Sequence, residues 1–372
     1  MPKRTLESTC NNGYCSKRVR RRAGNTWDLT LGSDCAGMNM PRLALAGFQV
    51  RERFRSEINP SCRKLLSYVW PDVDVDCPDM SMRDVAKMPT VDLYIAGVPC
   101  QPWSHASRVE GSPSGLADPR GRLWKDALEY VREKKPKLVV FENVKGLQDV
   151  CHRPILNDIL DSLTSSGYRC WHRVLNTMDH GIPQKRERLY IVAVRCDVGP
   201  CLEFSWPAPL RRCIPLKTLL AREGEKATPA FPPAELHNGR ALRLVTKAVE
   251  AVLKNSPTFD LAARSLVVDI GCTDKFAHHT VDHFPTLTAG RARERGWWIV
   301  DLGRQVSTRD MALLQGLSTE LPYAAAGVSA ARMSHMLGNS MSLNVLERLL
   351  PRVLAMAGIF PKGQRVADLW GP

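Results

Sequence analysis

The 372-residue sequence predicts an α/β fold with a second, smaller and more irregular domain. Between residues 27 and 196, short apolar runs bounded by Gly or Pro alternate with helical patterns, as in a mostly parallel sheet covered on both faces. From residue 197 to about 303, prolines crowd in and regular periodicity weakens. We therefore divide the chain into a tail (1–26), a sheet domain (27–196), an irregular domain (197–303) and a C-terminal return to the sheet domain (304–372).

The elements follow from local patterns. The first strand is expected at 27–31, before a glycine-bounded turn at 32–37 and a helical stretch that ends near Gly47. Further buried strands are expected at 91–96, 138–141 and 189–194, with a second strand ending just before Glu57. Helical spacing occurs at 123–132, 155–163, 241–253, 310–314 and 343–357.

The net charge points to an anionic partner. The chain has 52 Lys and Arg residues against 38 Asp and Glu residues, a formal charge of +14, which favours nucleic acid without indicating a mechanism. Seven basic residues and one acidic residue lie in the tail, in two clusters typical of a nuclear import signal. We expect a nuclear protein, or a cytoplasmic one if the source is bacterial; a tail that only attracts phosphates is an equal alternative.

Three further expectations come from composition. No apolar run approaches the roughly 18 residues that cross a bilayer, so we expect no membrane association. The twelve cysteines include no CxxC pair, so neither a disulfide framework nor a structural metal site is expected. We also expect a monomer.

A cysteine directly follows a predicted buried strand, in Gly97-Val98-Pro99-Cys100-Gln101-Pro102-Trp103-Ser104. The carboxyl end of a parallel strand is where open α/β sheets bind ligands. The flanking prolines stiffen the turn, and the loop from 104 to 121 is rich in Gly, Ser and Pro, as a lid over a substrate would be. Taken alone, a cysteine that merely shapes a turn is the more frequent case.

Polar residues also lie at the end of one further strand and at the start of another. Glu142 and Asn143 end the next strand, where burial would raise the pKa of the carboxyl and suit it to proton transfer. Arg186 and Arg188 open the strand at 189–194 and share one face, toward an anionic or carbonyl-bearing ligand; a surface pair is the alternative. Gly338-Asn339-Ser340 is expected to form a small polar turn before the last helix.

In this order, these segments resemble the motifs of the cytosine-5 DNA methyltransferase family. The resemblance covers nearly everything from Trp27 to Ala357 and includes six ordered motifs: Pro99-Cys100-Gln101, Glu142-Asn143-Val144, Gln184-Lys185-Arg186-Glu187-Arg188, Phe284-Pro285-Thr286-Leu287-Thr288-Ala289, Thr308-Arg309-Asp310-Met311-Ala312-Leu313-Leu314-Gln315-Gly316 and Gly338-Asn339-Ser340. It implies a Rossmann-like, S-adenosylmethionine-dependent methyltransferase with a mixed sheet and an irregular target-recognition domain.

The resemblance also implies roles for the reacting residues. Cys100 would add to carbon 6 of a flipped-out cytosine in DNA, with Gln101 and Ser104 beside the substrate. Glu142 would bind the exocyclic amine and the ring nitrogen. Arg188 would hold the base carbonyl, and Arg186 would lie near the nucleophile or the target phosphate.

The cofactor residues that the resemblance implies come from several strand ends. Glu57 would accept the ribose hydroxyls, Asp84 would bind the adenine amine, and Asn339 with Ser340 would line the methionine end. The remaining members of this set are Asp34, Gly37 and Pro99.

The first glycine-rich turn departs from the family pattern Phe-x-Gly-x-Gly-Gly. Cys35 and Met38 replace two of its glycines, Gly37 keeps the middle one, and we expect Gly32 to assume part of their role. Cys35 is rejected as a rival nucleophile, because that strand end is the cofactor side in the resembled fold.

The target-reading residues are expected in a Gly-bounded loop at 290–296, whose Arg291, Arg293 and Arg295 would reach guanine edges or phosphates. A solvated charged turn is the alternative for each arginine.

Two other functions remain open. The related transfer-RNA methyltransferases usually carry a Cys-Phe-Thr segment, and the nearest stretch here, 271–275, lacks the Phe, so DNA is favoured. A catalytically silent nucleic-acid-binding regulator is kept open by the altered first turn, although Cys100, Glu142, Arg186 and Arg188 are all present.

Overall fold

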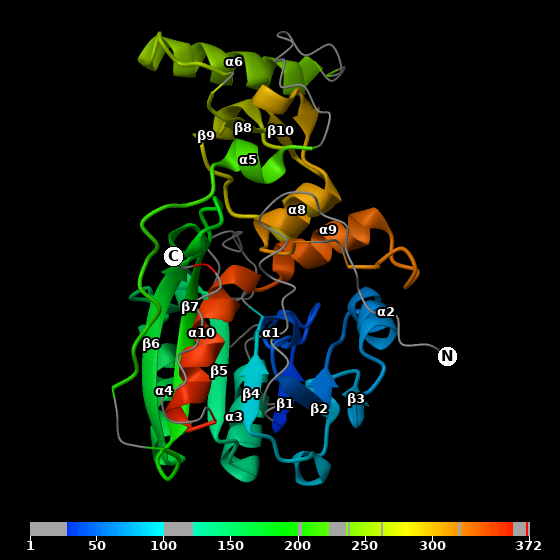
Figure 1. The fold of residues 1–372 in the computed structure, drawn as a ribbon, viewed down its shortest axis with the longest axis vertical. Coiled ribbons are helices and arrows are strands. Elements are labelled where there is room, and N and C mark those ends of the chain that lie inside the picture. The colour runs from blue at the N-terminus through cyan, green and yellow to red at the C-terminus, as the bar shows by residue number, and fades with distance from the viewer. Residues whose placement is uncertain are drawn as a thin grey trace.

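The computed structural model describes residues 28–99, 122–199, 203–222, 236, 239–261, 263–318, 321–359 and 370. These residues form a larger body around a seven-stranded sheet and a smaller body around a four-stranded sheet (Figure 1). The strands of the larger sheet lie within residues 28–195, and those of the smaller sheet within residues 266–305.

The large sheet is mixed. Its strands are β1 (Asp28–Asp34), β2 (Gln49–Ser56), β3 (Val75–Cys77), β4 (Leu93–Ala96), β5 (Leu138–Val144), β6 (Tyr168–Asn176) and β7 (Glu187–Arg195), in the order β3-β2-β1-β4-β5-β7-β6. The first five strands are parallel, whereas β7 is antiparallel to both β5 and β6. The predicted α/β class with a mixed sheet is confirmed.

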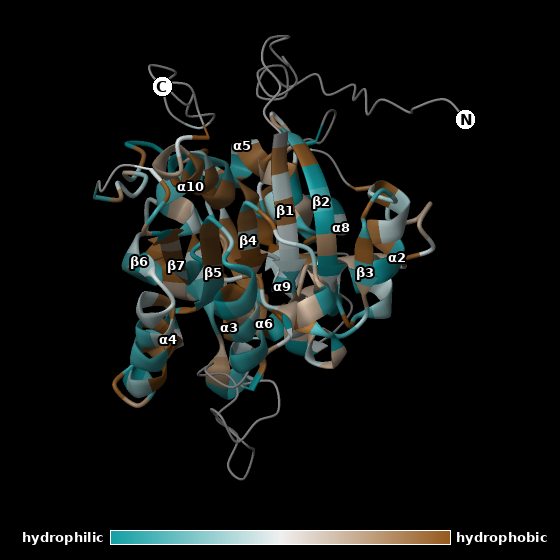
Figure 2. Ribbon diagram, turned by 90° about the horizontal axis from the view of Figure 1, so that it is seen from below, coloured by the Kyte–Doolittle hydropathy of each residue, from teal (hydrophilic) through white to brown (hydrophobic). Residues whose placement is uncertain are grey.

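Helices cover both faces of this sheet (Figure 2). On one side lie α3 (Leu123–Lys134) and α4 (Arg153–Ser165); on the other lie α1 (Met40–Ala44), α2 (Pro60–Val69) and α10 (Leu343–Met356). Alternate residues of β4 feed the two cores, since Leu93 and Ile95 pack on the α10 side while Tyr94 packs against α3. Burial on both faces explains why this strand is apolar throughout.

The smaller body contains a sheet of β8 (Leu266–Asp269), β9 (His279–Val281), β10 (Trp297–Ile299) and β11 (Arg304–Gln305), in the order β11-β10-β8-β9. The helix α6 (Gly239–Asn255) covers it with an apolar face that includes Leu244 and Val245. The sheet extends two residues past the predicted boundary at 303. The remaining helices are α5 (Leu216–Leu220), α7 (Ala289–Arg293), α8 (Thr308–Leu314) and α9 (Ala330–Asn339), of which α8 and α9 lie between the two sheets (Figure 1).

Single turns of 3₁₀-helix connect several elements. They are η1 (Met80–Met82), η2 (Val85–Lys87), η7 (Lys145–Gln148), η8 (Thr177–His180), η9 (Asp274–Phe276) and η10 (Val300–Leu302). Within the described ranges, no helix is both long and apolar enough to cross a membrane. The same residues contain no group of three or more His, Cys, Asp or Glu side chains placed to hold a metal ion.

Two local predictions were wrong. The strand β1 continues through Gly32 to Asp34, so the first turn starts later than expected. An added Cβ at Gly32 would overlap the Phe54 ring, so this glycine is explained by packing between strands and not by contact with a cofactor. Gly338 and Asn339 belong to α9, and the polar turn starts at Ser340.

Candidate active site

A cavity of about 430 Å³, partly open to solvent, lies at the carboxyl ends of β1 and β4. Five of the residues predicted for the cofactor and the chemistry line it: Asp34, Gly37, Glu142, Asn339 and Ser340. Residues more than 300 positions apart in the sequence therefore meet at the edge of the sheet where open α/β folds bind ligands.

The turn after β1, residues 35–39, forms one wall of this cavity. Cys35, Gly37 and Asn39 all have positive φ, at 50°, 56° and 53°. This left-handed conformation favours glycine, so the backbone explains why the family pattern has glycine where this chain has Cys35. The chain keeps the backbone shape of the turn with a different residue.

Glu57 anchors this turn from the end of β2. Its Oε2 accepts a hydrogen bond from the Gly37 amide at 2.6 Å, and its Oε1 accepts one from the Asn59 amide at 2.8 Å. Burial raises the pKa of the Glu57 carboxyl, while these backbone amides act in the opposite direction. Because a carboxylate oxygen has two lone pairs, Glu57 keeps acceptor capacity for hydroxyl groups of a ligand.

Asp34 lies at the cavity wall, but its carboxylate already has partners. It is buried, and it accepts hydrogen bonds from the guanidinium of Arg83 and the hydroxyl of Tyr94. Neighbouring Cys35 has a thiol whose pKa is well above its usual value, first through burial and then through the negative charge of Asp34. A neutral thiol is a poor nucleophile, so the structure agrees with setting Cys35 aside.

These residues fit S-adenosylmethionine. The cavity is lined by both polar and apolar groups, as small-molecule sites usually are. Gly97 leaves room along its floor, because an added Cβ would be 3.0 Å from Cε of Met341. Met38 and Ile95 provide part of the apolar lining. Glu57 does not line the cavity itself but binds the Gly37 amide in its wall, and its contact with ribose hydroxyls stays a prediction.

Other predicted cofactor residues lie elsewhere. Asp84 is exposed at the start of η2, where it caps the helix through the Ala86 amide and pairs with Lys87 at 3.0 Å. It does not line the described cavity, and neither does Pro99. Cys100, Gln101 and Ser104 lie outside the described residues, so their roles stay predictions.

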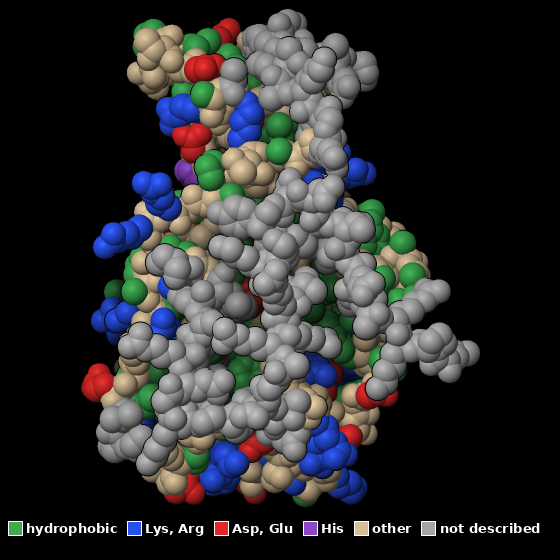
Figure 3. All heavy atoms as spheres, viewed as in Figure 1, with side chains coloured by type: hydrophobic (Ala, Val, Ile, Leu, Met, Phe, Trp, Pro, Cys, Tyr) green, Lys and Arg blue, Asp and Glu red, His purple; other side chains and the backbone are tan. Residues whose placement is uncertain are grey.

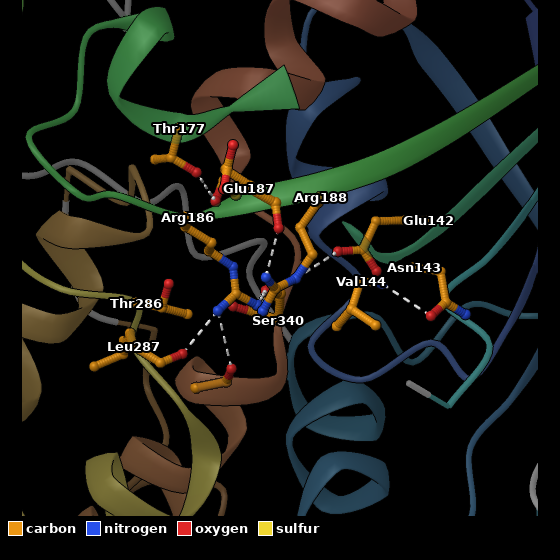
Figure 4. A network of polar contacts seen from close by, with 12 residues as sticks. Glu142, Asn143, Val144, Thr177, Arg186, Glu187, Arg188, Thr286, Leu287 and Ser340 are labelled. Carbon is orange, nitrogen blue, oxygen red and sulfur yellow. Dashed lines mark hydrogen bonds and ion pairs between the residues drawn. The ribbon is translucent and has the colours of Figure 1, made fainter. Parts of the chain in front are cut away.

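Glu142 and Arg188 form an ion pair beside the cavity, with Arg188 Nε 3.3 Å from Glu142 Oε1 (Figure 4). The antiparallel register of β5 and β7 brings the two side chains together from the ends of neighbouring strands. Burial raises the pKa of the Glu142 carboxyl; the positive charges of Arg188 and then Arg186 pull it back. Such a carboxyl can hold a proton at higher pH than an exposed one.

Arg186 is buried, and its guanidinium donates hydrogen bonds to backbone carbonyls. It donates to Leu287 at 2.7 Å, to Gly338 at 3.3 Å and to Ser340 at 2.7 Å (Figure 4). The guanidinium therefore ties the end of the irregular domain to the turn that closes the cavity. Its predicted contact with a nucleophile or a phosphate stays a prediction.

Two amide side chains organise the same region. Asn143 donates from Nδ2 to the Val98 carbonyl at 3.2 Å, which holds the backbone just before Pro99. Gln184 donates to the Leu314 carbonyl at 2.7 Å and accepts from the Leu287 amide at 3.0 Å. Gln184 opens the motif that contains Arg186 and Arg188, but a buried amide between two polar backbone groups has no local sequence signal.

The three arginines expected to read the target differ in their surroundings. The helix α7 replaces most of the expected loop, and Arg291 packs against Gly271 and Gly296 with its Nε 3.2 Å from Asp269 Oδ1. Arg293 and Arg295 are exposed. These two therefore remain the better candidates for contact with a polyanion.

The mixed sheet and the cavity at the carboxyl ends of its strands place the protein in the Rossmann-like class of α/β proteins. The model of the C-5 cytosine-specific DNA methylase family matches residues 30–354. The chain belongs to that family.

Curated relatives support this assignment. The type II methyltransferase M.HgiCII of Herpetosiphon aurantiacus is 37% identical over 155 residues, which cover 41% of this chain and 34% of the relative. M.HaeII of Haemophilus aegyptius is 34% identical, with 58% and 64% covered, and M.NgoBI of Neisseria gonorrhoeae is 28% identical, with 72% and 76% covered. The matched region spans only about a third of the length of the first relatives.

Solved structures share the fold. The methyltransferase EhMeth of Entamoeba histolytica matches with a TM-score of 0.60 at 16% identity, covering 88% of this chain and 98% of that one. A putative DNA modification methyltransferase from an E. coli prophage gives a TM-score of 0.60 at 19% identity, with 89% and 99% covered.

Proposed function

We propose that this protein transfers a methyl group from S-adenosylmethionine to carbon 5 of a cytosine in DNA, with the base flipped out and held covalently by Cys100. The observation that carries the proposal is the Glu142–Arg188 pair, which lies beside the cavity formed by the turn after β1. A proton-holding carboxyl and a forked cation next to the cavity at the carboxyl ends of β1 and β4 suit the activation of a cytosine ring.

Each of the three reacting side chains has a separate role in the reaction. The thiolate of Cys100 adds to carbon 6, since a strong and easily expelled nucleophile is needed to break the aromaticity of the ring reversibly. Glu142 gives a proton to the ring nitrogen and accepts a hydrogen bond from the exocyclic amine. Arg188 donates to the base carbonyl, where negative charge develops.

The cofactor side is held by separate groups. Glu57 binds the ribose hydroxyls, and Asn339 and Ser340 line the methionine end of the cavity. S-adenosylmethionine, when bound, supplies an electrophilic methyl group to carbon 5. Loss of the proton from carbon 5 then restores aromaticity as the bond between carbon 6 and the sulfur of Cys100 breaks.

A methyl-transfer assay tests this function. The full chain is incubated with labelled S-adenosylmethionine and either duplex DNA or transfer RNA, and the reaction is repeated with Cys100→Ser. Label is expected in DNA only and is lost in the variant. Cys151→Ser, which alters an exposed cysteine, is the matched control and keeps wild-type turnover.

Trapping the adduct tests the mechanism separately. A duplex containing 5-fluorocytosine blocks the final proton loss, so the wild-type chain and Cys151→Ser form a covalent complex that survives denaturing electrophoresis. Label in transfer RNA alone overturns the choice of substrate. No label in either nucleic acid favours a catalytically silent binding protein. Methyl transfer by Cys100→Ser would show that Cys100 is not the nucleophile.

A further inference from the structure

Arg83 is a buried charge behind the wall of the cofactor cavity. It lies between η1 and η2, its side chain is 2% exposed, and its guanidinium forms an ion pair with the fully buried carboxylate of Asp34. It also donates to the Asp126 carbonyl at 3.3 Å and lies 5.2 Å from the ring centre of Tyr130. Because a buried ion pair must offset the desolvation of two charges, its position next to a ligand site calls for an explanation.

Asp34 is the residue at which β1 ends and the turn begins. Its backbone lines the cavity, its carbonyl accepts from the Gly97 amide at 3.4 Å, and Cys35 follows in the left-handed conformation. The far end of the turn is fixed in a similar way, since Asn39 donates to Glu52 Oε1 at 2.6 Å. A non-glycine residue in this conformation is unfavourable, so side-chain ties must hold the turn in place.

We propose that Arg83 is a positioning residue for the cofactor site: by clamping Asp34 it holds residues 35–39 in the shape that glycines give other family members, and so sets the affinity for S-adenosylmethionine. This inference rests on the proposed function. Arg83 acts through Asp34 because the turn that follows Asp34 lacks the glycines that would adopt the shape of the turn without such a contact.

The contacts of Arg83 separate it from the methyl-transfer step. Its hydrogen-bond partners in the described part of the chain are Asp34, Tyr94 and Asp126, and none of these contacts reaches Glu142 or Arg188. Burial alone would lower the pKa of its guanidinium, but the partners Asp34 and Tyr94 outweigh this and raise it, so the clamp is charged at any working pH. Its loss should therefore act on cofactor binding and leave the chemical step largely unchanged.

Binding measurements on the full chain without DNA test the clamp. Titration calorimetry with S-adenosylmethionine and with S-adenosylhomocysteine compares the wild type with Arg83→Met, which keeps length and removes the charge. At least tenfold weaker binding of both ligands is expected. Arg51→Met is the matched control, because Arg51 pairs at the surface with Asp74, just before β3, and the binding of this variant stays within twofold of wild type.

Two further variants distinguish positioning from stability alone. Arg83→Met leaves Asp34 charged and buried, so it can also unfold the chain; the double variant Asp34→Asn/Arg83→Met removes both charges. We expect the double variant to melt near the wild-type temperature yet to bind the cofactor several-fold more weakly. Arg83→Lys, which keeps the charge but loses the forked donors, is expected to bind with intermediate affinity.

Kinetics give the second readout. In the methylation assay, the KM for S-adenosylmethionine should rise at least tenfold in Arg83→Met or, if that variant is unfolded, several-fold in the double variant, with kcat within about twofold. Wild-type affinity in the folded double variant overturns the clamp and leaves the proposed function intact. A wild-type chain that neither binds S-adenosylmethionine nor transfers methyl groups overturns the proposed function instead.

Discussion

At the scale of single residues, Glu142 is the group whose surroundings matter most for the proposed chemistry. Its side chain is 12% exposed, so burial disfavours the carboxylate, while Arg188 and Arg186 favour it. The net effect is a raised pKa, which keeps a proton available to a bound base.

The variant Glu142→Gln tests this property. The amide keeps the shape of the side chain but cannot give up a proton to the ring, so methyl transfer should fall about 10²- to 10⁴-fold, the usual contribution of general acid–base catalysis. The affinity for S-adenosylmethionine should change much less. Single-turnover rates and calorimetry measure the two quantities.

Glu187→Gln is the control for this substitution, because Glu187 opens the neighbouring strand β7, is partly exposed and pairs with Lys145. The pH dependence of unfolding gives an independent check. A carboxyl with a raised folded-state pKa stabilises the fold below its ordinary pKa of about 4.5 and loses that contribution as pH rises through the folded value. Wild type should therefore lose stability relative to Glu142→Gln as pH rises; the opposite trend contradicts the raised pKa.

At the scale of elements, periodicity predicted the strands that are buried on both faces. β4 is apolar throughout, and β5 and β7 contain the apolar runs 138–141 and 189–194, as is typical of strands at the centre of a sheet covered by helices. β6 is an edge strand whose residues are mostly half-exposed, with Arg173 and His172 at the surface, so it lacks that signal and was not predicted.

Gly32 shows why the first turn was placed too early. A glycine normally indicates a turn, but this one has no side chain because the Phe54 ring of the neighbouring strand occupies the space. Gly32→Ala should lower the free energy of unfolding by about 1–3 kcal/mol, the usual cost of overpacking a core. Denaturant unfolding measures the change.

Gly47→Ala is the comparison for that experiment, since no heavy atom lies within 4 Å of an added Cβ there. Its free energy of unfolding should stay within about 0.5 kcal/mol of wild type, as for most surface changes. Equal effects of the two substitutions would mean that the Phe54 contact does not determine the glycine at position 32.

At the scale of the whole molecule, the site was predictable where chemistry recurs in local motifs. Glu142 and Arg188 were each identified from a short motif, and their side chains form an ion pair in the structure. Arg83 could not be found in this way, because its partner lies 49 positions away and the pairing depends on the packing of β1 against the segment after β3. The packing of Arg291 against Gly271 and Gly296, which lie in two different segments, could not be predicted for the same reason.

The net charge of +14 is spread over the chain. On the face shown in Figure 3, the Lys and Arg side chains lie in separate groups with acidic side chains among them. Deleting residues 1–26, which carry seven of the basic residues and one acidic residue, should weaken DNA binding without abolishing methyl transfer. The dependence of binding on salt concentration should become less steep, as fluorescence anisotropy at several salt concentrations would show.

A chain in which residues 2–22 keep their composition in scrambled order is the control, because non-specific attraction to phosphates depends on charge and not on sequence. Complete loss of turnover in the deletion variant would instead assign the tail a direct part in catalysis.

The three carbonyl partners of Arg186 have a thermodynamic consequence. Leu287 lies on the segment that connects β9 of the smaller sheet to α7, whereas Gly338 and Ser340 adjoin the cavity, so one guanidinium joins the two segments. Rotation of the smaller body away from the larger one must break or bend at least one of these hydrogen bonds. If a cofactor at Ser340 and a duplex against the smaller body both favour the intact arrangement, each ligand tightens the binding of the other by the same factor, because linkage between two sites is reciprocal.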